Sequence, residues 1–359
     1  MTVFSAAAEP VPPVQRAVRA SSPLRVAVIG CGAIAEMYHL PALARHNSRL
    51  QSIVLVDPDM ARARALAVTR PEARVAESHE QIWDDIDAAI VATPPSLHHR
   101  IAMPLLARGV HVLCEKPLAE SAADARAMIE EARRSGAHLS VNHTRRAFPA
   151  LRRVKELLDS RAIGECTAIE HTEGARFAWP SASGWHFART NGAKGVLSDV
   201  GAHVFDTICW WLDEKPTLIS CSTDSFGGPE GVASVVLEHR ACTIKVRLNW
   251  LSRLSNTYRV IGTRGVIEGG IFDWRRLTMT GDGRGQRHIK VDSDANDYLG
   301  FGNVMIDNFL DTISGRAAPL APAAAVLPSL DLIEECYRHA SRMPMPWVET
   351  LPNLPVHAC

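Results

Sequence analysis

The alternation of short aliphatic runs with longer amphipathic segments is the feature that most constrains the fold of this chain. From Leu24 onward the pattern predicts strands over 25–30, 50–57, 87–92, 112–116 and 137–142, separated by helices over 33–47, 58–68, 96–108 and 121–135. Strands that alternate with helices in this way are typical of βαβ units, which build a parallel sheet. We therefore expect an α/β fold whose first domain, over 24–144, is a doubly wound parallel sheet.

The hydrophobic pattern changes after Arg145, which indicates a second domain of a different fold class. A helix over 149–159 comes first, and polar and apolar residues then alternate in segments such as 233–239 and 243–250. A period of two is expected for half-buried antiparallel strands. Two later helices, over 303–314 and 323–342, follow, and we expect one of them to pack back on the first domain. The sequence therefore predicts an α+β domain over 145–359.

Composition and charge exclude several classes of function. The 359 residues are many for one core, which favours two domains, and Lys+Arg and Asp+Glu are equal at 39 each. This balance argues against a broad nucleic-acid or anionic-membrane surface, since either needs an excess of basic groups. No apolar run is long enough to span a bilayer. We therefore expect no nucleic-acid partner and no membrane.

The eight cysteines are scattered singly and form no C-x-x-C pair. Such a pattern predicts neither a metal site nor a disulfide framework, and it fits a reducing, cytoplasmic setting. Residues 1–23 are rich in Ala, Pro, Val and Ser, which predicts a disordered extension. Glu9 and Pro10 interrupt the apolar stretch there, so we expect no secretory signal.

A glycine-rich turn follows the first predicted strand and opens a helix. It reads Gly30-Cys31-Gly32-Ala33-Ile34-Ala35 and fits the pattern G-x-G-x-x-A. Two glycines let the backbone approach a pyrophosphate closely, and the helix N-terminus favours its charge. Gly30, Gly32, Ala33 and Ile34 are therefore candidate cofactor-binding residues.

Asp57 ends the second predicted strand, at about the separation expected for the carboxylate that binds a ribose. A carboxylate there would bind the 2′-hydroxyl of NAD and repel the 2′-phosphate of NADP, so the sequence favours NAD. Arg62 and Arg64 leave NADP open, because a nearby arginine can accommodate the phosphate.

Two further candidates follow later strands of the first domain. Thr93 and Pro94, with His98 beyond them, come after the strand 87–92, where they can face a cofactor. Alternatively, the prolines only end the strand and His98 lies on a helix surface. Lys116 ends the next strand and follows Glu115, and both are candidate cofactor-binding residues. Ligands of this fold bind beyond the carboxyl ends of the strands, so the Lys116 ammonium can touch cofactor and substrate together. It could also be a phosphate contact or form an ion pair with Glu115.

The segment around Asp199 and His203 is the second strong signal. The two residues are four apart, so on a helix they share one face. Gly201 between them has a low helix propensity, which makes sense if something approaches the backbone closely. Asp206 extends the same face and may be either functional or structural.

The combination of these motifs resembles the Gfo/Idh/MocA oxidoreductases over nearly the whole chain from Leu24 onward. The matching segments are Gly30 to Ala35, Ala92-Thr93-Pro94-Pro95 with His98, Glu115-Lys116-Pro117, Asn142 with Arg145-Arg146, and Asp199 with His203 and Asp206. The resemblance implies an N-terminal Rossmann domain and a C-terminal α+β domain with a large open, mostly antiparallel sheet. It also implies oxidation or reduction of a sugar or cyclitol carbon by NAD(P), and homo-oligomers, dimers or tetramers, formed through that sheet.

Carried over by position, the resemblance implies a catalytic set of Lys116, Asp199 and His203. It also places Asn142, Arg145 and His186 near the substrate. The glycine triplet usual before the aspartate helix is replaced here by Ala193-Lys194-Gly195, which puts a cation near the substrate entrance or merely on a loop.

We expect hydride transfer between nicotinamide and a carbinol carbon, with His203 accepting the hydroxyl proton, since histidine needs little tuning near neutral pH. Lys116 would stabilise the developing alkoxide, and Asp199 would bind a neighbouring hydroxyl. Lysine as the base remains an alternative. A phosphorylated or nucleotide-linked sugar is an alternative substrate, and a non-catalytic cofactor- and sugar-sensing protein is the rival function.

Overall fold

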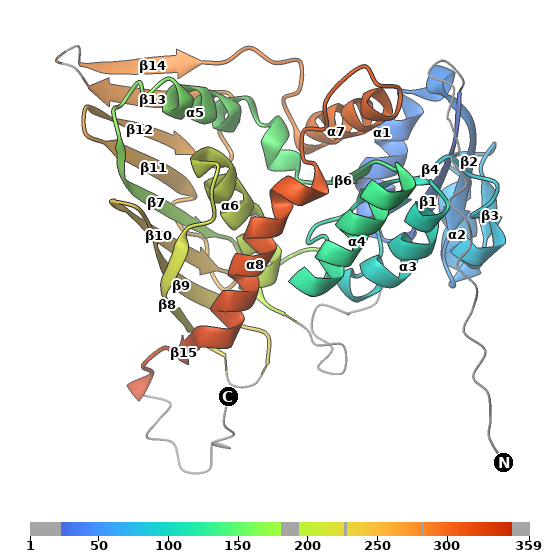
Figure 1. Ribbon diagram of the computed structural model, residues 1–359, viewed down its shortest axis with the longest axis horizontal. Helices are drawn as coiled ribbons and strands as arrows, with labels where there is room; N and C mark the ends of the chain where they lie inside the picture. The colour runs from blue at the N-terminus through green and yellow to red at the C-terminus, as the bar shows by residue number, and fades with distance from the viewer. Residues whose placement is uncertain (1–22, 181–193, 226–227, 282, 284, 347–359) are drawn as a thin grey trace.

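The computed structural model describes residues 23–180, 194–225, 228–281, 283 and 285–346. Two sheets lie side by side along the longest axis of the molecule, each with helices packed on it (Figure 1). The predicted disordered extension falls almost wholly outside the described residues. Within them, no helix is both long enough and apolar enough to cross a membrane.

The first sheet has six parallel strands in the order β3-β2-β1-β4-β5-β6. This is the doubly wound arrangement that the βαβ pattern predicts. The strands are β1 (Leu24–Ile29), β2 (Leu50–Val56), β3 (Arg74–Ala76), β4 (Ala88–Val91), β5 (His111–Cys114) and β6 (Leu139–Val141). Its helices include α2 (Met60–Ala67), α3 (Pro95–Ala107) and α4 (Ala122–Ser135). The sequence did not predict β3, which is only three residues long.

The ends of α4 show why these segments fold as they do. The Ser121 side chain accepts a hydrogen bond from the Asp124 amide at the N-terminus. Gly136 follows the last residue with φ +74°, a left-handed conformation that glycine adopts without a Cβ penalty. Both residues therefore confine the helix to the predicted range.

The predicted helix over 33–47 is not one regular α-helix. A π-helical turn, Ala35–His39, precedes α1 (Leu40–Ala44), and a 3₁₀ turn covers Asn47–Arg49. The Leu40 amide donates to the Ala35 carbonyl five residues earlier, and Pro41 has no N–H to continue an α-helical ladder. This local widening was not visible in the hydrophobic pattern.

The second sheet has nine strands in the order β14-β13-β12-β11-β7-β10-β9-β8-β15 and is mostly antiparallel. Among the described strands of this second sheet, only the pairs β7–β10 and β8–β15 are parallel. The strands are β7 (Cys166–Gly174), β8 (Thr217–Thr223), β9 (Val232–His239), β10 (Cys242–Asn249), β11 (Thr257–Gly262), β12 (Gly265–Gly270), β13 (Arg276–Gly281), β14 (Gln286–Lys290) and β15 (Ala340–Arg342). The predicted class of this region is confirmed.

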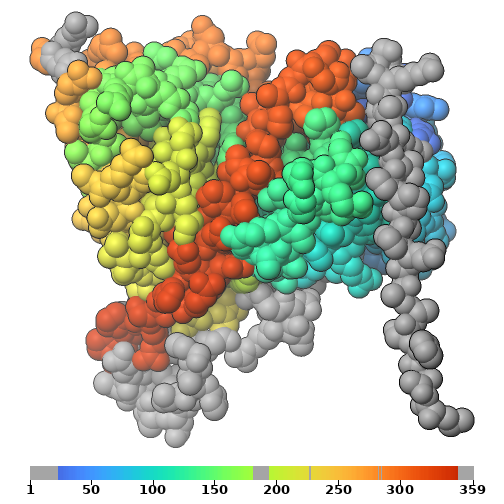
Figure 2. All heavy atoms as spheres, in the orientation of Figure 1, coloured from blue at the N-terminus to red at the C-terminus, as the bar shows by residue number. Residues whose placement is uncertain are grey.

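Helices α5 (Pro149–Asp159), α6 (Val196–Leu212) and α8 (Ala323–His339) cover one face of this sheet (Figure 1). The helix predicted over 323–342 ends at His339, because Ala340–Arg342 leave it to pair with β8. Along the face shown in Figure 2, α8 runs as an orange-red diagonal band beside α4 of the first domain. The Glu334 carboxylate on α8 accepts from the Ala122 amide at the start of α4, at 2.6 Å.

Helix α7 (Tyr298–Ile313) packs back on the first domain, as predicted for one late helix. Its buried residues Ile306, Phe309 and Leu310 share a hydrophobic cluster with β1 and β2. The predicted division after residue 144 lies between β6 and α5 and stays a prediction. Late segments of the chain thus complete the core of the first sheet.

Candidate functional site

A cavity of about 600 Å³ opens at the carboxyl ends of β1, β2, β4 and β5, where the second domain faces the first. Its wall includes every predicted site residue within the described ranges except His98. His186 lies outside the described residues. The fold therefore brings together groups from six predicted motifs at the edge where doubly wound sheets bind ligands.

The glycine turn forms one end of the cavity. Gly30 has φ +97°, and a Cβ there would lie 2.6 Å from the Ala92 carbonyl oxygen, so only glycine fits. A Cβ on Gly32 would meet nothing within 4 Å. The open backbone at Gly32, with Ala33 and Ile34 beside it, leaves room for a pyrophosphate against the first helical turn.

Asp57 lies beside this turn and is only 5% exposed. One carboxylate oxygen accepts from the Cys31 amide at 2.9 Å, and the other from the Asp59 amide at 2.9 Å. Arg62 places a guanidinium nitrogen 3.6 Å from the same carboxylate. Each Asp57 oxygen keeps a second lone pair, so the group can still accept from a ribose hydroxyl.

Thr93 and Pro94 follow β4 and line the cavity, and the buried Thr93 hydroxyl has no hydrogen-bond partner within the described residues. The structure corrects the expectation for His98, which is 0% exposed. Its two ring nitrogens lie 2.9 Å from the Pro117 carbonyl and 2.8 Å from the Thr93 carbonyl. His98 therefore joins two cavity loops from behind and cannot contact a cofactor directly.

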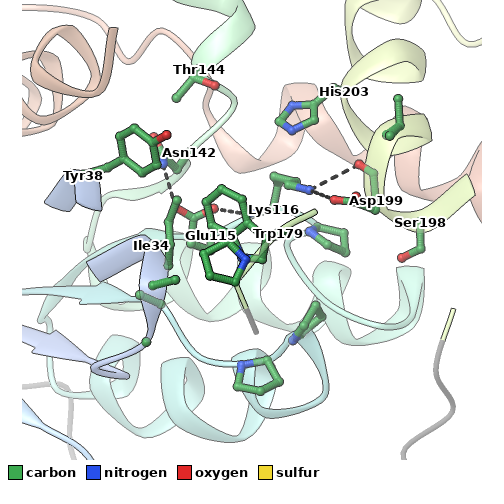
Figure 3. A pocket seen from close by; sticks show the side chains of 18 of the residues that line it. Ile34, Tyr38, Glu115, Lys116, Asn142, Thr144, Trp179, Ser198, Asp199 and His203 are labelled. Carbon is green, nitrogen blue, oxygen red and sulfur yellow. Dashed lines mark hydrogen bonds and ion pairs between the residues drawn. The ribbon is translucent and has the colours of Figure 1, made fainter. Parts of the chain in front are cut away.

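Lys116 reaches from the end of β5 to the first turn of α6. Its ammonium donates to the Asp199 carboxylate at 2.6 Å and to the Asp199 backbone carbonyl at 3.2 Å. Figure 3 shows the two side chains pointing toward one another, with the His203 ring at the same end of the cavity. The ammonium has three N–H groups, so one donor remains for a ligand.

Glu115 is not the ion-pair partner of the Lys116 side chain. Its carboxylate accepts from the Asn142 side-chain amide at 2.7 Å and from the Lys116 backbone amide at 3.2 Å (Figure 3). It also contacts His39 Nε2 at 2.8 Å. Burial opposes its charge, but the hydrogen bond and the charge of His39, the hydrogen bond from Asn142 and the positive charge of Lys116 hold the pKa of Glu115 below its ordinary value. Glu115 is therefore ionised near neutral pH.

His203 lies one turn beyond Asp199 on α6, and its ring stands edge-on to His143 with centroids 5.9 Å apart. Burial, and then the positive charges of Lys116 and Arg145, lower the pKa of His203 well below its ordinary value. His203 Nδ1 has no hydrogen-bond partner within the described part of the chain. A neutral imidazole with an unused nitrogen is able to accept a proton.

Arg145 belongs to the cavity wall but is already paired. It donates to Glu173 in a two-fold hydrogen-bonded pair at 2.5 and 2.8 Å, and the pKa of Glu173 falls to about 2 although burial opposes its charge. Only its Nε lacks a partner among the described residues. Asp206, left open by the sequence, forms a similar buried pair with Arg146 at 2.7 and 3.0 Å. Asp206 is therefore structural.

Gly201 and Glu230 explain how α6 is held. A Cβ on Gly201 would lie 3.2 Å from the Phe205 ring and 3.3 Å from Leu248, so close packing against Phe205 and β10 favours glycine here. The buried Glu230 carboxylate accepts from the Gly195 and Leu197 amides at 3.2 and 2.9 Å. It thereby caps the helix that carries Asp199 and His203, and sequence reasoning missed it because 35 positions separate Glu230 from Gly195.

Several other cavity residues were also missed. Tyr38 of the π-helical turn stacks on Trp179, with ring centroids 6.3 Å apart and an interplanar angle of 11°. Tyr298 of α7 lies 5.9 Å from Tyr38. The widened turn that brings Tyr38 and His39 to the cavity could have been suspected from Pro41. No local signal places Tyr298 there.

The residues present fit a bound nicotinamide dinucleotide. The open backbone at Gly32 and the carboxylate of Asp57 suit its phosphates and ribose. The Thr93 hydroxyl and the side-chain amide oxygen of Asn142 are buried acceptors without partners in the described residues. Such a molecule would leave Lys116, Asp199 and His203 at the far end for a second ligand.

Comparison with known proteins agrees with this arrangement. A sequence model of an oxidoreductase family with an NAD-binding Rossmann fold, Gfo/Idh/MocA, matches residues 24–143. A model of the Gfo/Idh/MocA C-terminal domain matches residues 151–268. The two segments cover the first sheet, the strands β7 to β11 of the second sheet and more than half of the chain, so the chain belongs to the Gfo/Idh/MocA oxidoreductase family.

Similar proteins include 1,5-anhydro-D-fructose reductase of Ensifer adhaerens, 30% identical over 59% of this chain and 64% of the relative. Inositol 2-dehydrogenase of Corynebacterium glutamicum is 28% identical over 53% of this chain and 54% of the relative. The chain thus spans less than two thirds of the length of these relatives. An oxidoreductase structure from Thermotoga maritima shares the fold with a TM-score of 0.77 and 21% identity, covering 88% of this chain and 96% of that one.

Proposed function

We propose that this protein is an NAD(P)-dependent dehydrogenase or reductase that acts on a carbinol carbon of a sugar, a sugar derivative or a cyclitol. The observation that carries the proposal is the convergence of Lys116, Asp199 and neutral His203 at the end of the cavity away from Asp57. Three groups that can bind and deprotonate a hydroxyl there match the chemistry of alcohol oxidation.

The bound nicotinamide would supply the hydride acceptor or donor. In the oxidation direction, His203 accepts the proton of the reacting hydroxyl, because its imidazole is neutral at working pH. The remaining N–H of Lys116 donates to the same oxygen and stabilises its developing negative charge. Asp199, fixed by Lys116 and by the capped helix, accepts from a neighbouring hydroxyl. Lys116 as the proton acceptor is the alternative.

The cavity wall supports a ring-shaped polyol as substrate. Tyr38, Phe177, Trp179 and Trp250 line it and offer aromatic faces of the kind that pack on sugar rings. The names of the relatives point the same way, since one is a reductase of an anhydro sugar and the other a dehydrogenase of a cyclitol. A free sugar or inositol is therefore the proposed substrate class.

A charged substrate is the second candidate. Lys194 and Arg176 line the cavity, and neither forms an ion pair with a carboxylate among the described residues. The Lys194 ammonium instead donates to the Glu120 carbonyl at 2.8 Å. These cations favour a phosphorylated or nucleotide-linked sugar if the free sugars prove poor substrates.

NAD is the proposed cofactor, with NADP possible. Asp57 presents its carboxylate to the ribose position, which disfavours a 2′-phosphate. Arg62, 3.6 Å from Asp57, partly offsets that charge and leaves NADP open.

We also propose a cytoplasmic homo-oligomer, a dimer or tetramer, that forms through the second sheet. No helix within the described ranges covers one face of this sheet (Figure 1), and residues such as Lys245 and Arg247 of β10 are exposed there. The seven described cysteines are free, which fits a reducing compartment. Light scattering of the purified chain measures the oligomeric state, and a monomer would contradict the assembly.

The test of the function is the absorbance of reduced nicotinamide with a panel of free sugars and cyclitols, and with their phosphorylated and nucleotide-linked forms. We expect turnover with at least one ring polyol. Activity confined to the charged forms would support the second candidate. Tight binding of cofactor and sugar without any turnover across the panel would contradict an enzyme and favour a sensor.

A further inference from the structure

Glu115 presents a buried carboxylate to the cavity wall at the end of β5. The residue is 8% exposed, and all the hydrogen bonds that the structure gives its carboxylate come from neutral amides or from an imidazole nitrogen. The His39 contact at 2.8 Å is an ion pair whenever that imidazole is protonated. The carboxylate is therefore held in place without a permanently cationic partner of its own.

The charged groups around Lys116 and Arg145 are matched in pairs. Lys116 has its carboxylate partner in Asp199 at 2.6 Å, and Arg145 has its partner in Glu173 at 2.5 Å. His203 is neutral, because its pKa lies well below the ordinary value owing first to burial. Among these groups, the negative charge of Glu115 is the one in excess.

The position of Glu115 relative to Asp57 determines which part of a bound dinucleotide Glu115 would face. Asp57 follows β2, and three steps along the sheet, through β1 and β4, lead to β5. At a strand spacing of about 4.8 Å, the two sites are separated by roughly 14 Å, a span that a dinucleotide can bridge. With its adenine ribose at Asp57, the nicotinamide would lie against Glu115.

We propose that Glu115 selects the redox form of the cofactor: its buried negative charge stabilises the cationic, oxidised nicotinamide over the neutral, reduced one. The inference rests on the proposed binding of a nicotinamide dinucleotide. The roles proposed for Lys116, Asp199 and His203 do not require such a preference for one redox form. An attraction between unit charges about 6 to 10 Å apart in a partly buried site corresponds to a preference of about tenfold to a hundredfold.

The test compares the dissociation constants of NAD⁺ and NADH, measured on the full chain by calorimetry without any sugar. Glu115→Gln removes the charge and keeps the size of the side chain. We expect the ratio of the NAD⁺ to the NADH dissociation constant to rise by about tenfold or more. Glu115→Asp keeps the charge and should stay within about threefold of the unmodified protein.

Two further variants keep the result interpretable. Glu115→Met also removes the charge and decides the question if the glutamine variant does not fold. Glu120→Gln is the matched control, because Glu120 lines the same cavity but is only half-buried, and the ratio should not change. A folded Gln or Met variant with an unchanged ratio would overturn the inference. If the ratio of the two dissociation constants depends on Glu115 but the protein turns over no polyol, the proposed reaction is contradicted and this inference is not.

Discussion

The ammonium of Lys116 and the carboxylate of Asp199 meet at 2.6 Å although 83 positions separate them in the chain. One residue follows β5 of the first sheet, and the other lies in the first turn of α6, which packs on the second. The contact therefore joins the two domains at the cavity, and the proposed chemistry depends on both being in place.

The first prediction concerns His203. A base must be unprotonated to act, and burial lowers the pKa of His203 well below the ordinary value of 6.5. The acid limb of the kcat/KM profile should therefore lie below pH 6.5, with activity lost as the pH falls through the lowered pKa. His203→Asn should reduce kcat by about 10² to 10⁴ and abolish this limb. The exposed His288→Asn is the control, and an unchanged profile in His203→Asn would leave Lys116 as the base.

The second prediction concerns the cap of α6. Glu230→Ala leaves two buried backbone N–H groups and the Tyr337 hydroxyl without their acceptor. Each lost partner costs about 1 to 3 kcal/mol, so we expect the free energy of unfolding in urea to fall by roughly 3 kcal/mol. Glu238→Ala, at an exposed position of β9, should change it little. Equal effects of the two variants would show that the cap contributes nothing.

The third prediction is a pH dependence of stability at His111. Its Nδ1 accepts from the His138 amide at 2.9 Å, and burial, then the charge of His138, lowers its pKa to about 4. The unfolded chain therefore binds a proton more readily than the folded one, so stability falls as the pH drops from 6.5 toward 4. Between pH 7 and pH 5 we expect a loss on the order of 2 kcal/mol from this group.

His111→Asn tests that value, because asparagine keeps an acceptor for the amide and does not titrate. The unfolding free energy of the variant should fall less steeply between pH 7 and pH 5 than that of the unmodified chain. His288→Asn should keep the original slope. A slope that does not differ between His111→Asn and the unmodified chain would contradict the assignment.

The fourth prediction concerns the choice of cofactor. Asp57→Ser removes the charge at the ribose position, keeps a hydroxyl acceptor and leaves Arg62 with Asp59, at 3.3 Å, as its remaining carboxylate partner. The ratio of kcat/KM with NADP to that with NAD should rise by about tenfold or more, since one repelling carboxylate is gone and the arginine can bind the phosphate. Arg62→Gln in the same background should reverse most of the gain. A clear preference of the unmodified protein for NADP would refute the role given to Asp57.

Local pattern was enough to predict most of the fold. Strands such as β4 and β5 are buried on both sides, so they read as continuous aliphatic runs, and Gly136 marks the end of α4 as expected. The exceptions have physical causes. Pro41 converts the first helix into a widened turn, and the last three residues of the predicted final helix pair with β8.

The sequence predicted the residues of the candidate site only where they lie close together along the chain. Spacing placed Asp199 and His203 on one face, but it could not show that Glu115 bonds His39 and Asn142, because those contacts span 76 and 27 positions. For the same reason the burial of His98 was missed. Its position suggested a cofactor contact, whereas its ring lies behind the loop that it supports.

The replacement of Lys116 tests the central claim most directly. Lys116→Ala should bind NAD⁺ with a dissociation constant within a few-fold of the unmodified protein, measured by calorimetry. Its turnover of the best polyol should fall by about 10² or more, because the donor that stabilises the developing alkoxide is gone. Arg133→Ala, at an exposed position of α4, should leave both values unchanged. Near-normal turnover in Lys116→Ala with intact NAD⁺ binding would contradict the account.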